Sequence, residues 1–219
     1  MKILFYGDSI TDAGRRREDL TATGLGGLGY GYVRSIADKL IGEHPNEHEI
    51  INTGISGNRI VDLYSRIKAD CWNFEPDLIS ILIGVNDVWH ELGGGRNGVE
   101  IDRFEKVYRM LIEDTKKRLP NVKMMLLEPF VLEGSATRSH EQEPDRYQRF
   151  LSVYDYAKVV KQLAEEYGLV FVPLQEKLTE GSKKHGVEYY LNDGVHPWFG
   201  GAKLIADEWV QAFEKNFNK

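Results

Sequence analysis

Three side chains in this sequence are of the types that together activate a serine. Ser9 stands in a Gly-Asp-Ser segment near one end of the chain, and Asp193 and His196 lie three residues apart near the other. A serine hydroxyl is a poor nucleophile until a base takes its proton, and histidine is the usual base because its ordinary pKa lies near neutral pH. A carboxylate on the other ring nitrogen fixes the tautomer of that histidine. The pattern therefore predicts Ser9 as nucleophile, His196 as base and Asp193 as the group that orients His196.

Donors for the negative charge that such an attack creates are also present. Gly57 offers a backbone N–H, and its lack of a Cβ allows close approach. Asn86, in the segment Gly84-Val85-Asn86-Asp87, offers a side-chain amide, and Ser9 offers its own backbone N–H. Preorganised donors of these kinds stabilise a tetrahedral oxyanion. Ser9, Gly57 and Asn86 are therefore the predicted oxyanion hole.

The same residues admit other interpretations. A Gly-Asp-Ser segment after a strand is also a common turn and helix N-cap, and the first helix could bind an anion without catalysis. Asp8, Asp87, Asp193 and His196 could instead hold a metal ion for phosphoester hydrolysis, although the sequence has no H-x-x-x-H motif and no Cys/His cluster. The sequence favours a serine hydrolase that needs no metal and no cofactor. A metal-dependent phosphoesterase and a non-catalytic binding module remain as alternatives.

The elements that must position these residues alternate between strand and helix. Continuous apolar runs are typical of strands buried on both faces of a parallel sheet, and segments of helical period lie between them. The predicted strands span about 2–6, 49–52, 77–83, 122–127 and 169–172, and the main predicted helices about 32–42, 60–67, 104–119, 146–167 and 200–216. Such alternation predicts a parallel sheet with helices on both faces. Polar segments that directly follow the first three strands would then share one rim.

The composition is that of an ordinary globular protein. The 219 residues are 42% hydrophobic and 28% charged, and the net charge of −6 argues against a nucleic-acid or anionic-membrane partner. Cys71 is the one cysteine, so no intrachain disulfide forms. No signal peptide is recognisable, and no apolar run approaches the ~20 residues of a membrane helix. We therefore expect a soluble cytoplasmic protein.

The run Arg15-Arg16-Arg17 is followed at once by acidic residues, which predicts a solvated loop.

Four segments, in order, resemble the blocks that define the SGNH/GDSL hydrolase family: Gly7-Asp8-Ser9-Ile10-Thr11, Gly57, Gly84-Val85-Asn86-Asp87 and Asp193-x-x-His196. The resemblance spans nearly the whole chain and implies one domain over residues 1–219. It implies a flavodoxin-like three-layer α/β/α fold with a five-stranded parallel sheet in the order 2-1-3-4-5. It also implies a serine esterase with Ser9 N–H, Gly57 N–H and the Asn86 amide in the oxyanion hole. The G-x-S-x-G elbow of α/β-hydrolases is absent, because Thr11 stands where the second glycine would be.

A finer similarity concerns the substrate. The segment Gly84-Val85-Asn86-Asp87-Val88-Trp89 and the Gly-rich loop after the first block are similar to those of bacterial carbohydrate acetylesterases, including xylan and xylo-oligosaccharide deacetylases. The expected partner is a small ester, such as an acetylated oligosaccharide. The absence of a long apolar groove motif also favours a small acyl group on a polar alcohol. A lysophospholipase or thioesterase of the same family is the alternative. The sequence is compatible with a monomer and with a homo-oligomer.

Two tryptophans flank the predicted catalytic residues. Trp89 and Trp198 each lie within three residues of Asn86 or His196. They predict a flat wall for a sugar ring or a cover over the acyl pocket, and packing at the rim of the core is an equal alternative. Further candidate substrate-binding residues are Arg59, Tyr30 and Asp8. The polar segment 133–145 has no periodicity, which predicts a surface loop or a lid.

Overall fold

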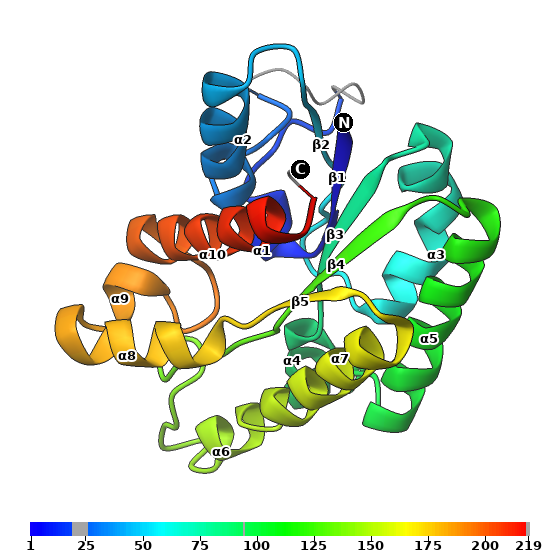
Figure 1. The fold of residues 1–219 in the computed structure, drawn as a ribbon. Helices are drawn as coiled ribbons and strands as arrows, with labels where there is room; N and C mark the ends of the chain where they lie inside the picture. Colours follow the sequence, from blue (N-terminus) through cyan, green and yellow to red (C-terminus); the bar gives the residue numbers. More distant parts are fainter. Residues whose placement is uncertain (19–25, 94, 218–219) are drawn as a thin grey trace.

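The five apolar runs form one parallel β-sheet in the computed structural model, which describes residues 1–18, 26–93 and 95–217. The strands are β1 (Lys2–Gly7), β2 (Glu49–Asn52), β3 (Leu78–Leu82), β4 (Lys123–Leu127) and β5 (Val170–Val172). They lie in the order β2-β1-β3-β4-β5 (Figure 1). The predicted strand order is therefore confirmed.

The register of the central strands brings their carboxyl ends to one edge of the sheet. Gly7 of β1 pairs with Leu82 of β3, and Phe5 pairs with Asn52 of β2. All residues of β3 are buried, as expected for a strand covered on both faces. Its one hydroxyl, on Ser80, accepts the indole N–H of Trp209 at 2.9 Å, which satisfies a polar group inside the core.

Helices cover both faces of this sheet. On one face α2 (Tyr32–Glu43) packs against α10 (Phe199–Phe217), and on the other α5 (Ile101–Arg118) packs between α3 (Ile60–Asp70) and α7 (Val153–Tyr167) (Figure 1). The buried stripe of α5 has helical spacing and consists of Phe104, Tyr108, Leu111, Ile112 and Thr115. The predicted three-layer α/β/α architecture is confirmed.

Shorter helices lie in the connections. They are α1 (Ser9–Asp12), α4 (Val85–Leu92), α6 (Arg146–Phe150), α8 (Gln175–His185), α9 (Val187–Tyr190) and a 3₁₀ turn at Trp72–Phe74. The helix predicted over 146–167 is in fact α6 and α7. Between them the Ser152 hydroxyl donates to the Arg149 carbonyl at 2.8 Å, and such local bonds compete with the helical ladder.

The polar segment after β3 opens helix α4, where no helix was predicted. Val85, Asn86, Asp87 and Val88 are all buried there. Tertiary packing therefore sets this helix, since a helix of this length is marginal alone. The consequence is that Asn86 projects from a first helical turn and not from a loose turn.

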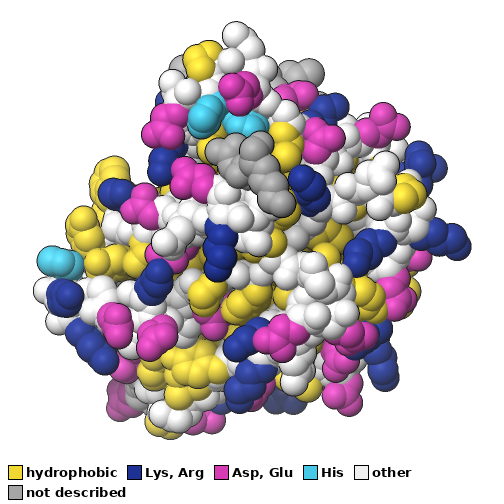
Figure 2. Space-filling model, viewed as in Figure 1, with side chains coloured by type: hydrophobic (Ala, Val, Ile, Leu, Met, Phe, Trp, Pro, Cys, Tyr) yellow, Lys and Arg dark blue, Asp and Glu magenta, His cyan; other side chains and the backbone are white. Residues whose placement is uncertain are grey.

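Charged side chains of both signs are interspersed over the face shown in Figure 2. This mixture matches the modest net charge of −6. Within the ranges that the structure describes, no helix is both long and apolar enough to cross a membrane.

Candidate active site

Ser9 lies at the carboxyl end of β1, where the chain turns directly into α1. Asp8 caps this short helix, because its Oδ1 accepts the backbone N–H of Ile10 at 2.9 Å. A Cβ on Gly7 would lie 2.5 Å from the Leu82 carbonyl oxygen and 2.4 Å from the Thr11 hydroxyl oxygen. Only glycine fits such a turn, which presents Ser9 at the rim of the sheet.

The structure brings Ser9, His196 and Asp193 into one chain of hydrogen bonds. Ser9 Oγ lies 2.9 Å from His196 Nε2, and His196 Nδ1 lies 2.7 Å from Asp193 Oδ2. The other carboxylate oxygen, Oδ1, accepts the backbone N–H groups of Val195 and His196 at 2.9 and 2.8 Å. The loop therefore fixes the rotation of the carboxylate, and the carboxylate fixes the imidazole.

The charges of this pair support each other. Burial works against ionisation of Asp193, but hydrogen bonds from the His196 ring and from two backbone N–H groups outweigh it and lower the pKa of Asp193 to about 2. The hydrogen bond to Asp193 raises the pKa of His196 above 6.5, with burial opposing it. Asp193 is thus a carboxylate at neutral pH, and it favours a protonated His196.

The predicted oxyanion donors lie on two neighbouring segments of the rim. Gly57, in the loop after β2, has a φ of +83°. No protein atom lies within 4 Å of the position of a Cβ there. The positive φ favours glycine, and the space beside Gly57 is open. Asn86 is 5% exposed, and its Nδ2 donates to the Asn58 carbonyl at 3.1 Å. That bond uses one of the two amide hydrogens.

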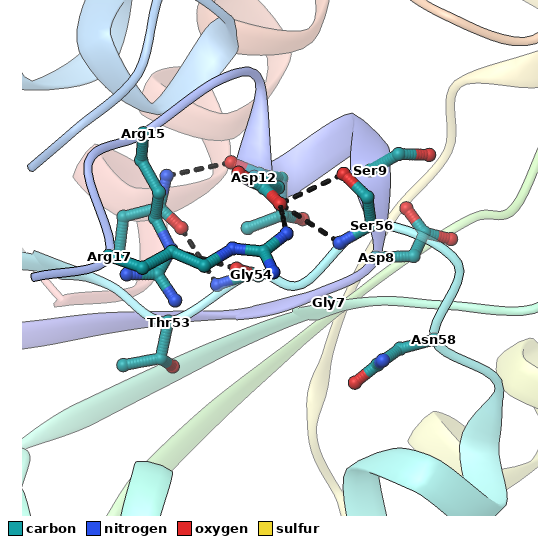
Figure 3. A network of polar contacts seen from close by, with 12 residues as sticks. Gly7, Asp8, Ser9, Asp12, Arg15, Arg17, Thr53, Gly54, Ser56 and Asn58 are labelled. Atoms are coloured by element: carbon teal, nitrogen blue, oxygen red, sulfur yellow. Dashed lines mark hydrogen bonds and ion pairs between the residues drawn. The ribbon is translucent and has the colours of Figure 1, made fainter.

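Sequence reasoning missed a polar network beneath the Gly57 loop (residues 53–59). Asp12 Oδ2 accepts the backbone N–H and the hydroxyl of Ser56 at 2.9 and 2.8 Å, and Arg17 pairs with the same oxygen (Figure 3). Arg15 Nε donates to the Gly54 carbonyl at 2.7 Å. Arg15 is half-buried, so the predicted solvated loop is wrong for Arg15. Arg16 and Arg17 are exposed as predicted, although Arg17 also pairs with Asp12. The acidic residue five positions earlier, Asp12, was the available signal.

Two of the candidate substrate-binding residues, Arg59 and Asp8, form hydrogen bonds with other residues of the protein. Arg59 binds the Asp62 carboxylate through Nε at 2.8 Å and also donates to the Asn97 carbonyl, so it braces the start of α3. Asp8 is fully buried, and burial raises its pKa to about 7. The predicted contact of Asp8 with substrate does not fit this burial, because its carboxyl faces the interior and caps α1.

Of the aromatic candidates, Trp89 lies against the histidine ring, and Trp198 and Tyr30 line a neighbouring pocket. The ring of Trp89 is 6.0 Å from the His196 ring, centre to centre, and packs edge-on against Phe150 at 5.5 Å. Trp198 and Tyr30 are 46% and 74% exposed. They line a pocket of about 350 Å³ whose wall also includes Pro197, directly after His196.

The segment predicted as a surface loop or lid supports the histidine loop. Leu132 and Ala136 donate their backbone N–H groups to the carbonyls of Gly194 and Asp193, both at 2.9 Å. A Cβ on Gly134 would lie 2.2 Å from the Gly194 backbone nitrogen. The first part of segment 133–145 thus packs directly on the Asp193 loop. These contacts hold it in place, so it is a supporting loop and does not have the free edge of a lid.

A metal site does not assemble from the acidic candidates. Over residues 1–18, 26–93 and 95–217, no group of three or more His, Cys, Asp or Glu side chains is arranged to hold a metal ion. Asp8 instead caps α1, and Asp193 is engaged by His196 and two backbone N–H groups.

The Ser9 hydroxyl, the His196 imidazole and the Asp193 carboxylate are hydrogen-bonded in that order at the carboxyl edge of a doubly wound parallel sheet. This arrangement defines a serine hydrolase of the three-layer α/β/α class. The model of the GDSL-like lipase/acylhydrolase family matches residues 5–204. The chain belongs to this family, and it is a carboxylic ester hydrolase of the serine type. The predicted family and enzyme class are confirmed.

Similar proteins cover the chain almost completely. An acetylxylan esterase from Geobacillus stearothermophilus is 36% identical over 223 residues, which are 96% of this chain and 96% of that protein. The crystal structure of Axe2, an acetylxylan esterase from the same organism, superimposes with a TM-score of 0.82 at 36% identity, over 96% of this chain and 93% of that one. A GDSL-like lipase from Parabacteroides merdae gives a TM-score of 0.85 at 39% identity, over 96% and 94% of the two chains. Three structures of the Geobacillus esterase are of catalytic mutants in which a serine, an aspartate or a histidine is replaced by alanine.

Proposed function

We propose that Ser9 attacks the ester carbonyl while His196 takes the hydroxyl proton on Nε2. The observation that carries this proposal is the 2.9 Å contact between Ser9 Oγ and His196 Nε2, with Asp193 bound to the far side of the ring. Collapse of the tetrahedral intermediate breaks the ester C–O bond, and His196 returns the proton to the leaving alcohol. Water, deprotonated by His196, then attacks the acyl-Ser9 carbonyl. Collapse of this second intermediate breaks the bond to Ser9 Oγ, which takes the proton back from His196 as the acid leaves. These steps use protein groups and water alone.

The oxyanion of both tetrahedral intermediates would lie between the backbone N–H groups of Ser9 and Gly57 and the amide of Asn86. The bond from Asn86 to the Asn58 carbonyl supports this assignment, because it holds the amide one residue from Gly57. A preorganised donor of this kind contributes ~10²–10³ in rate.

The proposed substrate is an acetyl ester on a neutral sugar, of the acetylated xylo-oligosaccharide type. The acetylxylan esterase among the relatives supports it. The chain contributes two features of its own. Trp89, held by Phe150, lies beside His196, where a short acyl group would fit, and the exposed rings of Tyr30 and Trp198 offer flat apolar surfaces to a sugar.

An acyl-length series tests this function. Hydrolysis rates are measured for p-nitrophenyl acetate, butyrate and octanoate, and acetate release is measured from acetylated xylotetraose, with wild type and S9A. We expect kcat/KM to fall at least about tenfold from acetate to octanoate, and S9A to lose at least about 10³-fold on every substrate. A preference for octanoate or for a lysophospholipid would contradict the acetyl-ester proposal, and wild-type turnover by S9A would contradict the mechanism.

A further inference from the structure

The Gly57 loop is held at its centre by a buried acid on the helix that carries Ser9. Asp12 is 2% exposed and lies at the end of α1. Its Oδ2 accepts both the backbone N–H and the hydroxyl of Ser56, the residue directly before Gly57. In Figure 3 the Asp12 carboxylate lies between Arg17 and Ser56. One carboxylate thus joins the short helix of the nucleophile to the peptide unit next to Gly57.

The far end of the same loop is held by a second buried acid, on the helix that carries Asn86. Asp87 is 1% exposed. Its Oδ1 accepts the backbone N–H of Ile60, the first residue of α3, at 3.0 Å. The preceding residue, Asn86, donates to the Asn58 carbonyl at 3.1 Å. The first turn of α4 therefore contacts the loop end at two points.

We propose that Asp12 and Asp87 are positioning residues that clamp the Gly57 loop between α1 and α4, so that its N–H group is fixed relative to Ser9 and to the Asn86 amide. The inference rests on the proposed role of Gly57 and Asn86 as oxyanion donors. Neither acid contacts the ester. Each acts through the backbone that it holds, and donors placed in advance stabilise the oxyanion without reorganisation during the reaction.

The two clamps work in different charge states. Burial opposes ionisation of Asp12, but the bonds from Arg17 and Ser56 outweigh it and lower the pKa of Asp12. At the other end, burial raises the pKa of Asp87 to about 8, and the nearby Asp8 adds to the rise. Asp12 is therefore a carboxylate at neutral pH, whereas Asp87 is mostly a neutral acid. An asparagine can replace the neutral acid but cannot form an ion pair with Arg17.

This difference gives an experiment with internal controls. The variants D12A, D12N, D87A and D87N are compared with wild type, S9A and D38N, the last of which removes an Asp–Arg pair on the outer helix α2. For p-nitrophenyl acetate, D12A and D87A should lower kcat ~10–100-fold with KM little changed, because both tetrahedral steps use the displaced donor. D87N should restore kcat to within about threefold of wild type, whereas D12N should not. D38N should match wild type.

Folding is monitored by thermal unfolding, since either alanine variant removes a buried group. If D12A does not fold, S56A replaces it for the Asp12 clamp. If D87A does not fold, D87S replaces it, because its hydroxyl is one atom nearer the backbone than the carboxyl oxygen that accepts the Ile60 N–H; D87S should lower kcat at least about threefold more than D87N. S56A removes the hydroxyl contact only and should lower kcat about threefold to tenfold. A folded D12A or D87A with kcat within about twofold of wild type would overturn the clamp. So would a loss confined to KM, or a D12N variant as active as D87N.

The S9A control separates the two proposals. If S9A is inactive while D12A and D87A keep wild-type kcat, the clamp fails and the proposed function stands. If S9A itself keeps wild-type turnover, the proposed function fails first.

Discussion

Replacing Asp193 by asparagine should remove the ability of His196 to act as a base while leaving the loop intact. The carboxylate oxygen Oδ1 accepts two backbone N–H groups, from Val195 and His196. In D193N only the amide oxygen can accept those bonds, so the NH₂ group must face His196 Nδ1. It would donate to Nδ1, which places the imidazole proton on Nε2 and points an N–H at Ser9.

The structure sets the size of this effect. Lowering the pKa of Asp193 from 3.8 to about 2 corresponds to about 2.4 kcal/mol of preference for the carboxylate, at about 1.4 kcal/mol for each tenfold change. Two backbone bonds share that preference with the ring, so loss of charge alone accounts for at most about 60-fold in rate. The wrong tautomer adds the remainder, and the expected loss of kcat is about 10³–10⁴-fold.

The assay is steady-state hydrolysis of p-nitrophenyl acetate at neutral pH, with thermal unfolding of the same samples. D193N should unfold within a few degrees of wild type, because the loop bonds are retained. D193A is the matched comparison: it loses those bonds as well, so it should unfold at a lower temperature. A loss of less than about 60-fold in D193N would refute the argument that the fixed amide imposes the tautomer.

Three further predictions follow from the site. Because the bond to Asp193 raises the pKa of His196, kcat/KM should rise with pH and reach half its plateau above pH 6.5, and a pH–rate profile that is flat from acid to neutral pH would contradict a histidine base. N86A should lower kcat about 10²–10³-fold with KM little changed, and an unchanged kcat in steady-state assays would remove Asn86 from the oxyanion hole. G57A places a Cβ on a residue with φ of +83°, so it should cost about 1–2 kcal/mol of stability in chemical denaturation and also lower kcat; a variant as stable as wild type would show that this backbone has relaxed.

The strands were the most predictable part of the fold. A run such as Leu78–Leu82 is apolar throughout because both faces of the sheet are covered, and this pattern requires no knowledge of distant contacts. Helix α4 was not predictable in the same way. Its first turn contains Asn86 and Asp87, which favour turns and caps, and it is helical because Val85 and Val88 are buried with them.

The candidate site likewise has a part that the sequence predicted and a part that it did not. Ser9, Asp193 and His196 were identifiable because they belong to four short segments that occur in one order along the chain, although each segment alone has other uses, and the structure does bring the three side chains together. Glycine at position 57 was predicted because it allows close approach, and its positive φ is a second reason for glycine that the sequence does not show. Contacts across the fold were out of reach, because nothing in the sequence shows that Asp12 meets Ser56, 44 residues further along the chain.

The account depends most on Ser9 as the covalent nucleophile. Intact-mass and peptide mass spectrometry after reaction with a small organophosphonate ester measures this directly. We predict one adduct per chain, located on Ser9, with loss of activity in proportion to labelling and no adduct in S9A. Inactivation with the adduct on another residue would contradict the central claim. So would an enzyme that carries no adduct after the reaction and still hydrolyses p-nitrophenyl acetate.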